Sequence, residues 1–168
     1  FQMHGVIRKL KSRQDWDKRW EQVMRDTPKI IPESELKTIA LNPDFYRTIQ
    51  GPELPSDITT HHPNFQRGGE YWAWRYLDSF VKERAVNYSK HISKPALSRT
   101  GCSRLSPYLT YGNISMRMVY QYTNQHYETS KNKRALLNFV SRLHWRCHFI
   151  QKFEDECAME FENANRAY

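Results

Sequence analysis

The chain has 168 residues and a formal net charge of +8, with 39% hydrophobic and 14% aromatic residues. This composition is too apolar for an intrinsically disordered protein, and the length suits one domain with a hydrophobic core or a piece of a larger protein. The excess of basic residues favours an anionic partner such as nucleic acid or a phosphorylated ligand, and it is equally compatible with a solubilising surface.

The cysteines indicate a reducing compartment. Cys102, Cys147 and Cys157 form no CxxC pair, which argues against a disulfide scaffold or a zinc site, so we expect a cytoplasmic protein. The seven histidines show no metal-ligand grouping. No apolar run approaches the roughly 20 residues of a membrane span, so no membrane is expected among the partners. Because the first residue is Phe1 and not Met, we expect a fragment or a processed product.

The first part of the chain predicts one helix and then an irregular connection. Residues 1–27 are interpreted as a linker and a first helix over about 13–25, with Ser12 as the start signal. Its apolar stripe is Trp16, Trp20 and Val23. Prolines recur through residues 28–67, which predicts an irregular segment with helical turns only at 33–40 and 43–49.

Regular helices return in residues 68–168. An amphipathic pattern predicts one long helix over 70–88, and a loop is expected at 89–105. No segment shows the alternation of a β-strand, so the predicted fold class is all-α, with a long irregular proline-rich segment. Further helices are predicted over 115–126, with Ser115 as N-cap, and over 132–153.

The segment SRTGCSRLSPYL at 98–109 has the chemistry of an anion cradle. Its hydroxyl groups donate hydrogen bonds, its arginines add charge, and its glycine lets the backbone approach a ligand closely. Ser106 before a proline is typical of a helix N-cap, and free N–H groups at a helix start favour an anion. An ordinary capped helix start explains the same residues, so both interpretations stay open. The hydroxyls and charges belong to Ser98, Thr100, Ser103, Ser106, Arg99 and Arg104.

The last predicted helix carries two different stripes. A core stripe, spaced for one helix face, is formed by Leu136, Val140, Leu143, Cys147 and Ile150. A second stripe is formed by Arg142, Trp145, Arg146 and Phe149, with Phe139 adjoining it. Arginine pairs with phosphate in a bidentate manner, and tryptophan offers a flat face to a base. Burial of the helix on both sides, with the arginines paired to carboxylates elsewhere, is the alternative.

Together these elements resemble the FAD-binding helical domain of the cryptochrome and DNA photolyase family. The resemblance is carried by GGE at 68–70, CSRLSPYLTYGNIS at 102–115 and RLHWRCHF at 142–149, in the family's order and with similar gaps. It covers about 68–165 and implies that residues 68–168 are the N-terminal part of that domain.

The resemblance implies a set of cofactor-binding residues. The turn at 102–106 matches the loop that holds the FAD phosphates through hydroxyl and backbone N–H groups, and Arg146 matches an arginine that faces the diphosphate. Tyr88 matches a tyrosine that contacts the flavin, and Phe139 lies where an aromatic residue often lines the cofactor. The residues implied to bind FAD are Tyr88, Cys102, Ser103, Arg104, Leu105, Ser106, Phe139 and Arg146.

The second stripe matches the surface that meets damaged DNA in this family. Trp145 matches the tryptophan against which a flipped pyrimidine dimer stacks, and Arg142 and Phe149 are the other predicted DNA contacts. Repair enzymes usually carry glutamate at the position of Arg142, so dimer repair by the usual hydrogen bonding is in doubt and a light-sensing role stays open. The family's usual threonine is replaced by Cys102, which removes one hydroxyl donor.

In an intact relative, light and FAD drive the splitting of a pyrimidine dimer, so the resemblance implies a carbon–carbon lyase acting on damaged DNA. The chain ends before the family's ring-contacting region and lacks its α/β antenna domain, so we expect it to be inactive alone and to bind FAD weakly or not at all. Two alternatives stay open. One is a non-enzymatic, basic helical module that binds nucleic acid, and the other is a structural piece that dimerises through core surface exposed by truncation.

Overall fold

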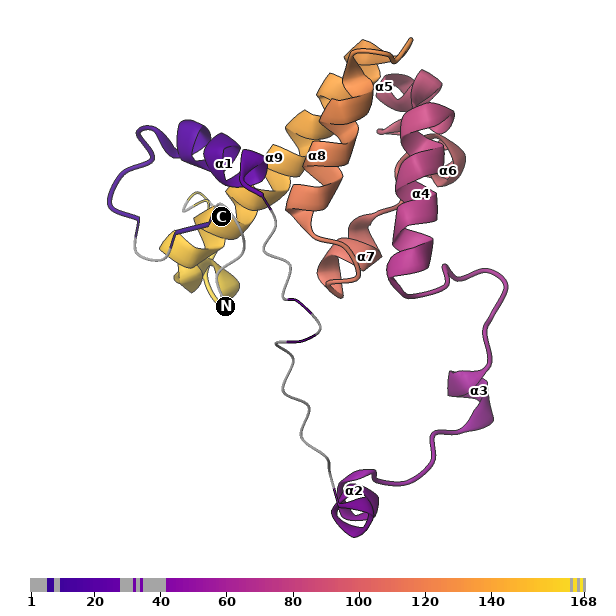
Figure 1. Ribbon diagram of the computed structural model, residues 1–168. Helices are drawn as coiled ribbons and strands as arrows, with labels where there is room; N and C mark the ends of the chain where they lie inside the picture. The colour runs from indigo at the N-terminus through magenta and orange to yellow at the C-terminus, as the bar shows by residue number, and fades with distance from the viewer. Residues whose placement is uncertain are drawn as a thin grey trace. The chain divides into compact units, whose positions relative to one another are not determined.

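The structure is a computed structural model that describes residues 6–7, 10–27 and 42–163, together with residues 32, 34, 165 and 167. It divides into two compact units, one made of Phe1–Thr27 and Gly68–Tyr168 and the other of Pro28–Arg67. All regular structure in the described ranges is helical, and no strand occurs there, which confirms the all-α prediction (Figure 1). No helix within these ranges has both the length and the apolar character to cross a bilayer.

In the first unit, α1 (Trp16–Arg25) starts later than predicted. Asp15 takes a left-handed backbone conformation with φ of 62°, which a continuous helix from Ser12 could not contain. The Ser12 hydroxyl instead accepts a hydrogen bond from the Gln14 N–H at 3.2 Å. The buried face of α1 is Trp16, Trp20 and Met24, whereas Val23 is only half-buried.

The end of α1 is fixed on α8 (Met116–Tyr127) by side chains that reach its last carbonyl groups. Gln121 Nε2 donates to the carbonyls of Met24 at 2.9 Å and Asp26 at 2.8 Å. Arg117 Nη1 donates to the carbonyl of the following residue, Thr27, at 3.3 Å. Because the last carbonyls of a helix have no partner within it, α8 satisfies one carbonyl of the last turn of α1 and those of the two residues after α1.

The helix predicted over 70–88 is broken in two. α4 (Glu70–Lys82) ends where Glu83 leaves the helical region, with φ of −127° and ψ of −59°. A 3₁₀ turn, η2 (Arg84–Asn87), and the short α5 (Tyr88–His91) follow. The apolar pattern behind the prediction runs through this break because buried side chains continue beyond it.

The loop predicted at 89–105 is mostly helical, which is a second correction. α6 (Pro95–Gly101) begins with a proline, whose missing N–H costs nothing in the first turn. A short connection leads to α7 (Ser106–Thr110). Ser106 is therefore the first residue of α7 and not its N-cap; Leu105 holds that position, and no side chain caps the helix.

The last two α-helices were predicted to within about two residues. Ser115 is the N-cap of α8, as predicted, and its hydroxyl accepts from the Met118 N–H at 3.1 Å. α9 (Lys133–Asp155) is followed by a 3₁₀ turn, η3 (Cys157–Glu160). Of the predicted core stripe on α9, the fully buried members are Leu136, Leu143 and Cys147, and the half-buried members are Val140 and Ile150.

The core of this unit contains a cluster of three buried rings. The ring centroids of Phe80 and Tyr88 lie 5.2 Å apart, those of Phe80 and Phe139 4.8 Å, and those of Tyr88 and Phe139 6.0 Å. All three pairs meet edge to face, the arrangement that aromatic quadrupoles favour. Since each ring comes from a different helix, the cluster joins α4, α5 and α9.

A polar brace also joins α4 to α8. The Tyr122 hydroxyl donates to the Asp78 carboxylate, and Lys82 Nζ lies 2.6 Å from Asp78 Oδ1. Lys82, and after it the Tyr122 hydroxyl, holds the pKa of Asp78 below its usual value. The stability that Asp78 contributes is therefore present above the pKa of an unfolded aspartate and is lost as pH falls through the lower, folded-state pKa.

Acid titration tests this brace. Between about pH 5 and pH 2, the wild type should lose more unfolding free energy than Asp78→Asn, by about 0.5 kcal/mol, because the half-exposed ion pair is screened by solvent. Urea unfolding followed by circular dichroism at each pH measures the difference. Tyr122→Phe is the matched variant, since it keeps the carboxylate and should keep most of the acid dependence. Identical pH profiles for wild type and Asp78→Asn would contradict the assignment.

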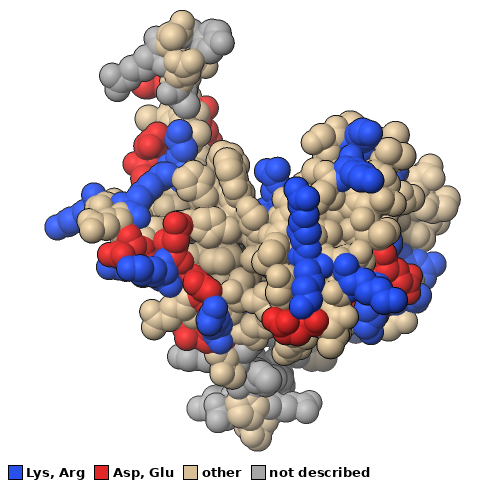
Figure 2. Space-filling model, turned by 90° about the horizontal axis from the view of Figure 1, so that it is seen from above, with Lys and Arg blue, Asp and Glu red and all other residues tan. Residues whose placement is uncertain are grey.

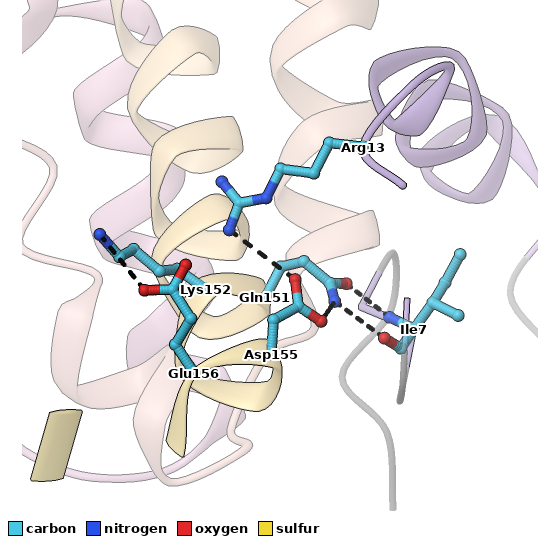
Figure 3. Close-up of polar contacts among 6 residues, drawn as sticks. All are labelled: Ile7, Arg13, Gln151, Lys152, Asp155 and Glu156. Carbon is cyan, nitrogen blue, oxygen red and sulfur yellow. Dashed lines mark hydrogen bonds and ion pairs between the residues drawn. The ribbon is translucent and has the colours of Figure 1, made fainter. Parts of the chain in front are cut away.

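The segment before α1 is held at the end of α9 by Gln151, which is only 1% exposed. Gln151 Oε1 accepts from the Ile7 N–H at 2.7 Å, and Nε2 donates to the Ile7 carbonyl at 2.8 Å (Figure 3). Nε2 also donates to Asp155 Oδ1 at 2.9 Å, and Arg13 Nη2 lies 3.7 Å from the same carboxylate. The buried side-chain amide of Gln151 thus exchanges two hydrogen bonds with the backbone of Ile7, as a residue of a neighbouring β-strand would.

The second unit contains short helices that bury no side chain. α2 (Pro43–Ile49) confirms the predicted turn at 43–49 and is capped by the Asn42 side chain. α3 (Ser56–Thr59) was not predicted. The turn predicted at 33–40 lies, apart from Ser34, outside the described residues.

Candidate anion-binding site

The turn between α6 and α7 has an unusual backbone. Arg104 takes a left-handed conformation with φ of 63°, uncommon for a residue with a Cβ, and Leu105 returns to the right-handed region with φ of −88° and ψ of −9°. Such alternation directs successive N–H groups to one side and forms an anion-binding concavity. In the part of the chain that the structure describes, the N–H groups of Ser103, Leu105 and Ser106 donate no hydrogen bond.

Two hydroxyl groups expected to face an anion are used inside α6. Ser98 Oγ and Thr100 Oγ1 donate to carbonyl groups of the preceding helical turn, at 2.8 and 3.2 Å. The expectation for these two was wrong because residues 98–101 are helical, and a helical serine or threonine bonds back to its own helix. Ser103 and Ser106 remain as the hydroxyl candidates.

Arg84, which the sequence analysis did not single out, contacts this turn from η2. Its Nη1 donates to the carbonyl of Cys102, and Thr100 O lies 3.5 Å from the same nitrogen. Its Nη2 donates to the carbonyl of Ser103 at 3.4 Å. Burial lowers the pKa of Arg84, and the side chain nevertheless stays charged at neutral pH. A sequence gives no signal of this role, because the partners of Arg84 are backbone groups.

Gly101 fixes the other side of the turn against His91 of α5. A Cβ at Gly101 would overlap His91 Nδ1 and would lie 3.0 Å from Cγ and 3.1 Å from Cβ of the same residue. Real Cβ contacts are almost never as short as the one to Nδ1, so a side chain at this position would require His91 to move. The absence of a side chain at Gly101 therefore lets the end of α6 pack closely against His91 of α5.

Two members of the predicted cofactor set, Cys102 and Tyr88, have raised pKa values. Burial raises the pKa of the half-buried Cys102 thiol, against the opposing charges of Arg84 and Arg104. Burial also raises the pKa of Tyr88 to about 12. Cys102 raises the pKa of Tyr88 further, and the positive charge of Arg142 lowers it.

The structure places Phe139 and Tyr88 in the core, within the ring cluster described above. It places Leu105 in the core too, with Ser106 exposed beside it. Their contact with a cofactor stays a prediction.

Arg146 of α9 has one buried guanidinium nitrogen that finds no hydrogen-bond partner among the described residues. Its side chain is half-buried, and its Nη1 is inaccessible to solvent and makes no hydrogen bond. An unmet donor of this kind costs about 1–3 kcal/mol or more, so such groups in native proteins usually have an ion, water or ligand as partner. No hydrogen bond within the described residues joins Arg146 to the turn at 102–106, so their convergence on one ligand stays a prediction.

The three residues predicted to contact DNA lie together on the exposed side of α9. Trp145 is 48% and Phe149 56% exposed, with ring centroids 5.6 Å apart. The guanidinium carbon of Arg142 lies 5.9 Å from the Trp145 ring. We call Arg142, Trp145 and Phe149 the α9 patch; it presents two aromatic rings and a cation to solvent.

A cavity of about 430 Å³ lies beside the α9 patch. Trp145 forms one wall, and the other lining residues come from α1, the segment before it and α9: Arg13, Trp16, Asp17, His144 and His148. This volume falls in the range of small-molecule sites, about 300–1,000 Å³. The described residues contain no group of three or more His, Cys, Asp or Glu side chains that could hold a metal ion.

Comparison with known proteins gives a partial match. No protein-family model and no solved structure matches the chain. A deoxyribodipyrimidine photo-lyase from Alkalihalophilus pseudofirmus (strain ATCC BAA-2126 / JCM 17055 / OF4) is 30% identical over 91 residues, which are 53% of this chain and 18% of that protein. The chain is therefore similar, over part of its length, to a small portion of a deoxyribodipyrimidine photo-lyase.

Proposed function

We propose that residues 68–168 form the phosphate-binding part of a flavin-binding helical domain of the cryptochrome and photolyase type. The observation that carries the proposal is the buried, unpartnered Nη1 of Arg146. A buried guanidinium nitrogen without an acceptor is a strong partner for a phosphate oxygen. The partial similarity to a photo-lyase supports FAD as the source of that phosphate.

In this proposal, the free N–H groups of the turn and the guanidinium of Arg146 hold the FAD diphosphate. The hydroxyls of Ser103 and Ser106 add donors, and Tyr88 and Phe139 line the cofactor from the core. When bound, the flavin supplies light absorption and electron transfer, while the protein supplies binding and orientation. The donor set fits a diphosphate because it combines neutral N–H groups with one full positive charge.

The α9 patch is the proposed contact with damaged DNA. Its exposed Trp145 ring is suited to stack on an extruded base, and Arg142 is suited to attract the phosphate backbone. Arginine in place of the family's usual glutamate changes how a lesion would be held, so light sensing is proposed beside dimer repair. Arg142→Glu should raise the affinity for a dimer-containing oligonucleotide if the intact protein repairs DNA.

Ligand titration tests the flavin proposal. FAD should bind more tightly than riboflavin, which lacks the diphosphate, by about tenfold or more, the value of one charge-assisted hydrogen bond. Arg146→Gln should lower the FAD affinity by about 10–100-fold and leave riboflavin binding unchanged. Quenching of flavin fluorescence measures both.

Arg134→Gln is the matched control, because it removes the same charge from an exposed position of the same helix. Equal loss of FAD affinity in Arg134→Gln and Arg146→Gln would show a general charge effect and would contradict the proposal. An FAD affinity of the wild type no higher than its affinity for riboflavin would also contradict it.

A second candidate is a nucleic-acid-binding module without flavin, and the cavity beside the exposed Trp145 favours it. Figure 2 shows basic side chains spread over one face of the molecule, with acidic side chains beside several of them. Contact with the phosphate backbone of a nucleic acid would therefore be confined to a small area. A colourless protein whose affinity for single-stranded DNA falls steeply with salt would support this candidate.

Self-association of the chain stays a prediction, and analytical sedimentation would measure it.

A further inference from the structure

We infer that Arg84 is the positioning residue of the turn at 102–106: it orients the N–H groups of the turn toward a phosphate without touching the ligand itself. The inference rests on the proposed function for its ligand. Its structural part, that Arg84 fixes the conformation of the turn, is testable without any ligand.

The first step concerns the carbonyl groups that Arg84 holds. The carbonyls of Cys102 and Ser103 both accept from its guanidinium. In a trans peptide the C=O of one residue and the N–H of the next point in opposite directions within one plane. Holding these two carbonyls on Arg84 therefore directs the N–H groups of Ser103 and Arg104 away from Arg84. The left-handed conformation of Arg104 then directs the N–H groups that follow it to the same side of the turn.

The second step concerns how Arg84 is itself anchored. On the α4 side, Nε donates to Ser79 Oγ at 3.1 Å, and Nη2 donates to the Tyr76 carbonyl at 2.7 Å. The rings of Tyr76 and Phe80 lie 5.8 and 5.7 Å from the guanidinium carbon. The guanidinium thus donates hydrogen bonds to α4 and lies against two aromatic rings, and these contacts fix its position.

The third step excludes Arg84 as a ligand-binding group. An arginine has five N–H donors. One at Nε meets Ser79, two at Nη1 face the carbonyls of Thr100 and Cys102, and two at Nη2 face those of Tyr76 and Ser103. No donor is left for a phosphate, so Arg84 acts through the backbone of the turn.

Lysine cannot replace this side chain, because an ammonium group is a compact charge with three donors and not a planar fork with five. In Arg84→Lys the carbonyls of the turn lose part of their support, while the positive charge and most of the apolar stem remain. This variant separates the geometry of the fork from its charge. Arg84→Met removes both the planar donor group and the positive charge.

The first measurement follows the thiols and needs no ligand. Cys102 is half-buried in the turn, Cys147 is buried in α9, and Cys157 is exposed. In Arg84→Lys the labelling rate of Cys102 with a disulfide reagent should rise by about tenfold, the factor expected when one hydrogen bond of a buried group is lost. Labelling of Cys147 should stay slow. Peptide mapping by mass spectrometry assigns each site.

The second measurement is ligand binding. Arg84→Lys and Arg84→Met should each lower the affinity for FAD by about tenfold or more and leave that for riboflavin unchanged. Arg75→Met is the matched control, because Arg75 also lies against aromatic rings on α4 but is exposed and does not reach the turn. A merely structural role would weaken both ligands equally.

Unchanged Cys102 labelling in Arg84→Lys would overturn the inference, as would an equal loss of FAD affinity in Arg75→Met. Faster labelling of Cys147 together with Cys102 would also overturn it, because it would show that the whole bundle opens and not the turn. If the wild type binds FAD no more tightly than riboflavin, the proposed function fails, and the thiol measurement still decides whether Arg84 positions the turn.

Discussion

Replacing Phe80 by alanine should lower the free energy of unfolding by about 3–5 kcal/mol, the usual cost of removing a buried phenylalanine. Phe80 is fully buried and is the common member of the ring cluster, in contact with Tyr88 and Phe139. Its loss would leave a cavity where α4, α5 and α9 meet, and it would remove the aromatic face behind Arg84. Urea unfolding followed by far-ultraviolet circular dichroism measures the change.

Tyr111→Ala is the matched control, because this ring lies in the same unit but is 81% exposed. It should change the unfolding free energy by no more than about 0.5 kcal/mol. A loss below about 1 kcal/mol in Phe80→Ala would show that the ring cluster is not the centre of the core.

Gly101→Ala should lower the free energy of unfolding by about 1–3 kcal/mol, the cost of overpacking. In an ordinary helical position the same change stabilises a protein by about 0.5–1 kcal/mol, so the sign itself is diagnostic. The destabilisation follows from the overlap with the His91 ring, whose Cγ and Cβ are too near for a rotation of the ring to relieve it. Thermal unfolding measures the shift.

A double-mutant cycle identifies the cause. In a His91→Ala background, Gly101→Ala should cost less than about 1 kcal/mol, because the ring that it meets is gone. Gly68→Ala is the control, since a Cβ there would meet nothing within 4 Å. An equal cost of Gly101→Ala in both backgrounds would exclude the His91 contact as its source.

The sequence predicts the parts of this fold that obey a simple pattern. α9 and α8 were found because their apolar stripes are long, and α8 has a serine cap at Ser115 that the structure confirms. The break at Glu83 was missed because burial continues across it. α6 was missed because only Gly101 in it is buried, so no apolar stripe marks it.

The candidate site also has residues that the sequence predicts and residues that it does not predict. The spacing of Arg142, Trp145 and Phe149 places them on one helix face, and the structure brings the three together. The role of Arg84 could not be predicted, because its partners are carbonyl groups that every residue has. The left-handed backbone at Arg104 has no sequence signal either, since such a conformation is ordinarily marked by glycine or asparagine.

The bonds from α8 to the last carbonyls of α1 have a consequence for the residues that follow. Gln121 and Arg117 hold the chain up to Thr27, and the first unit resumes at Gly68. Residues 28–67 therefore close a loop between two points of the first unit, and doubling the length of a loop costs only about 0.6 kcal/mol of chain entropy. Insertions and deletions there should be tolerated far better than any change within the helices that it connects.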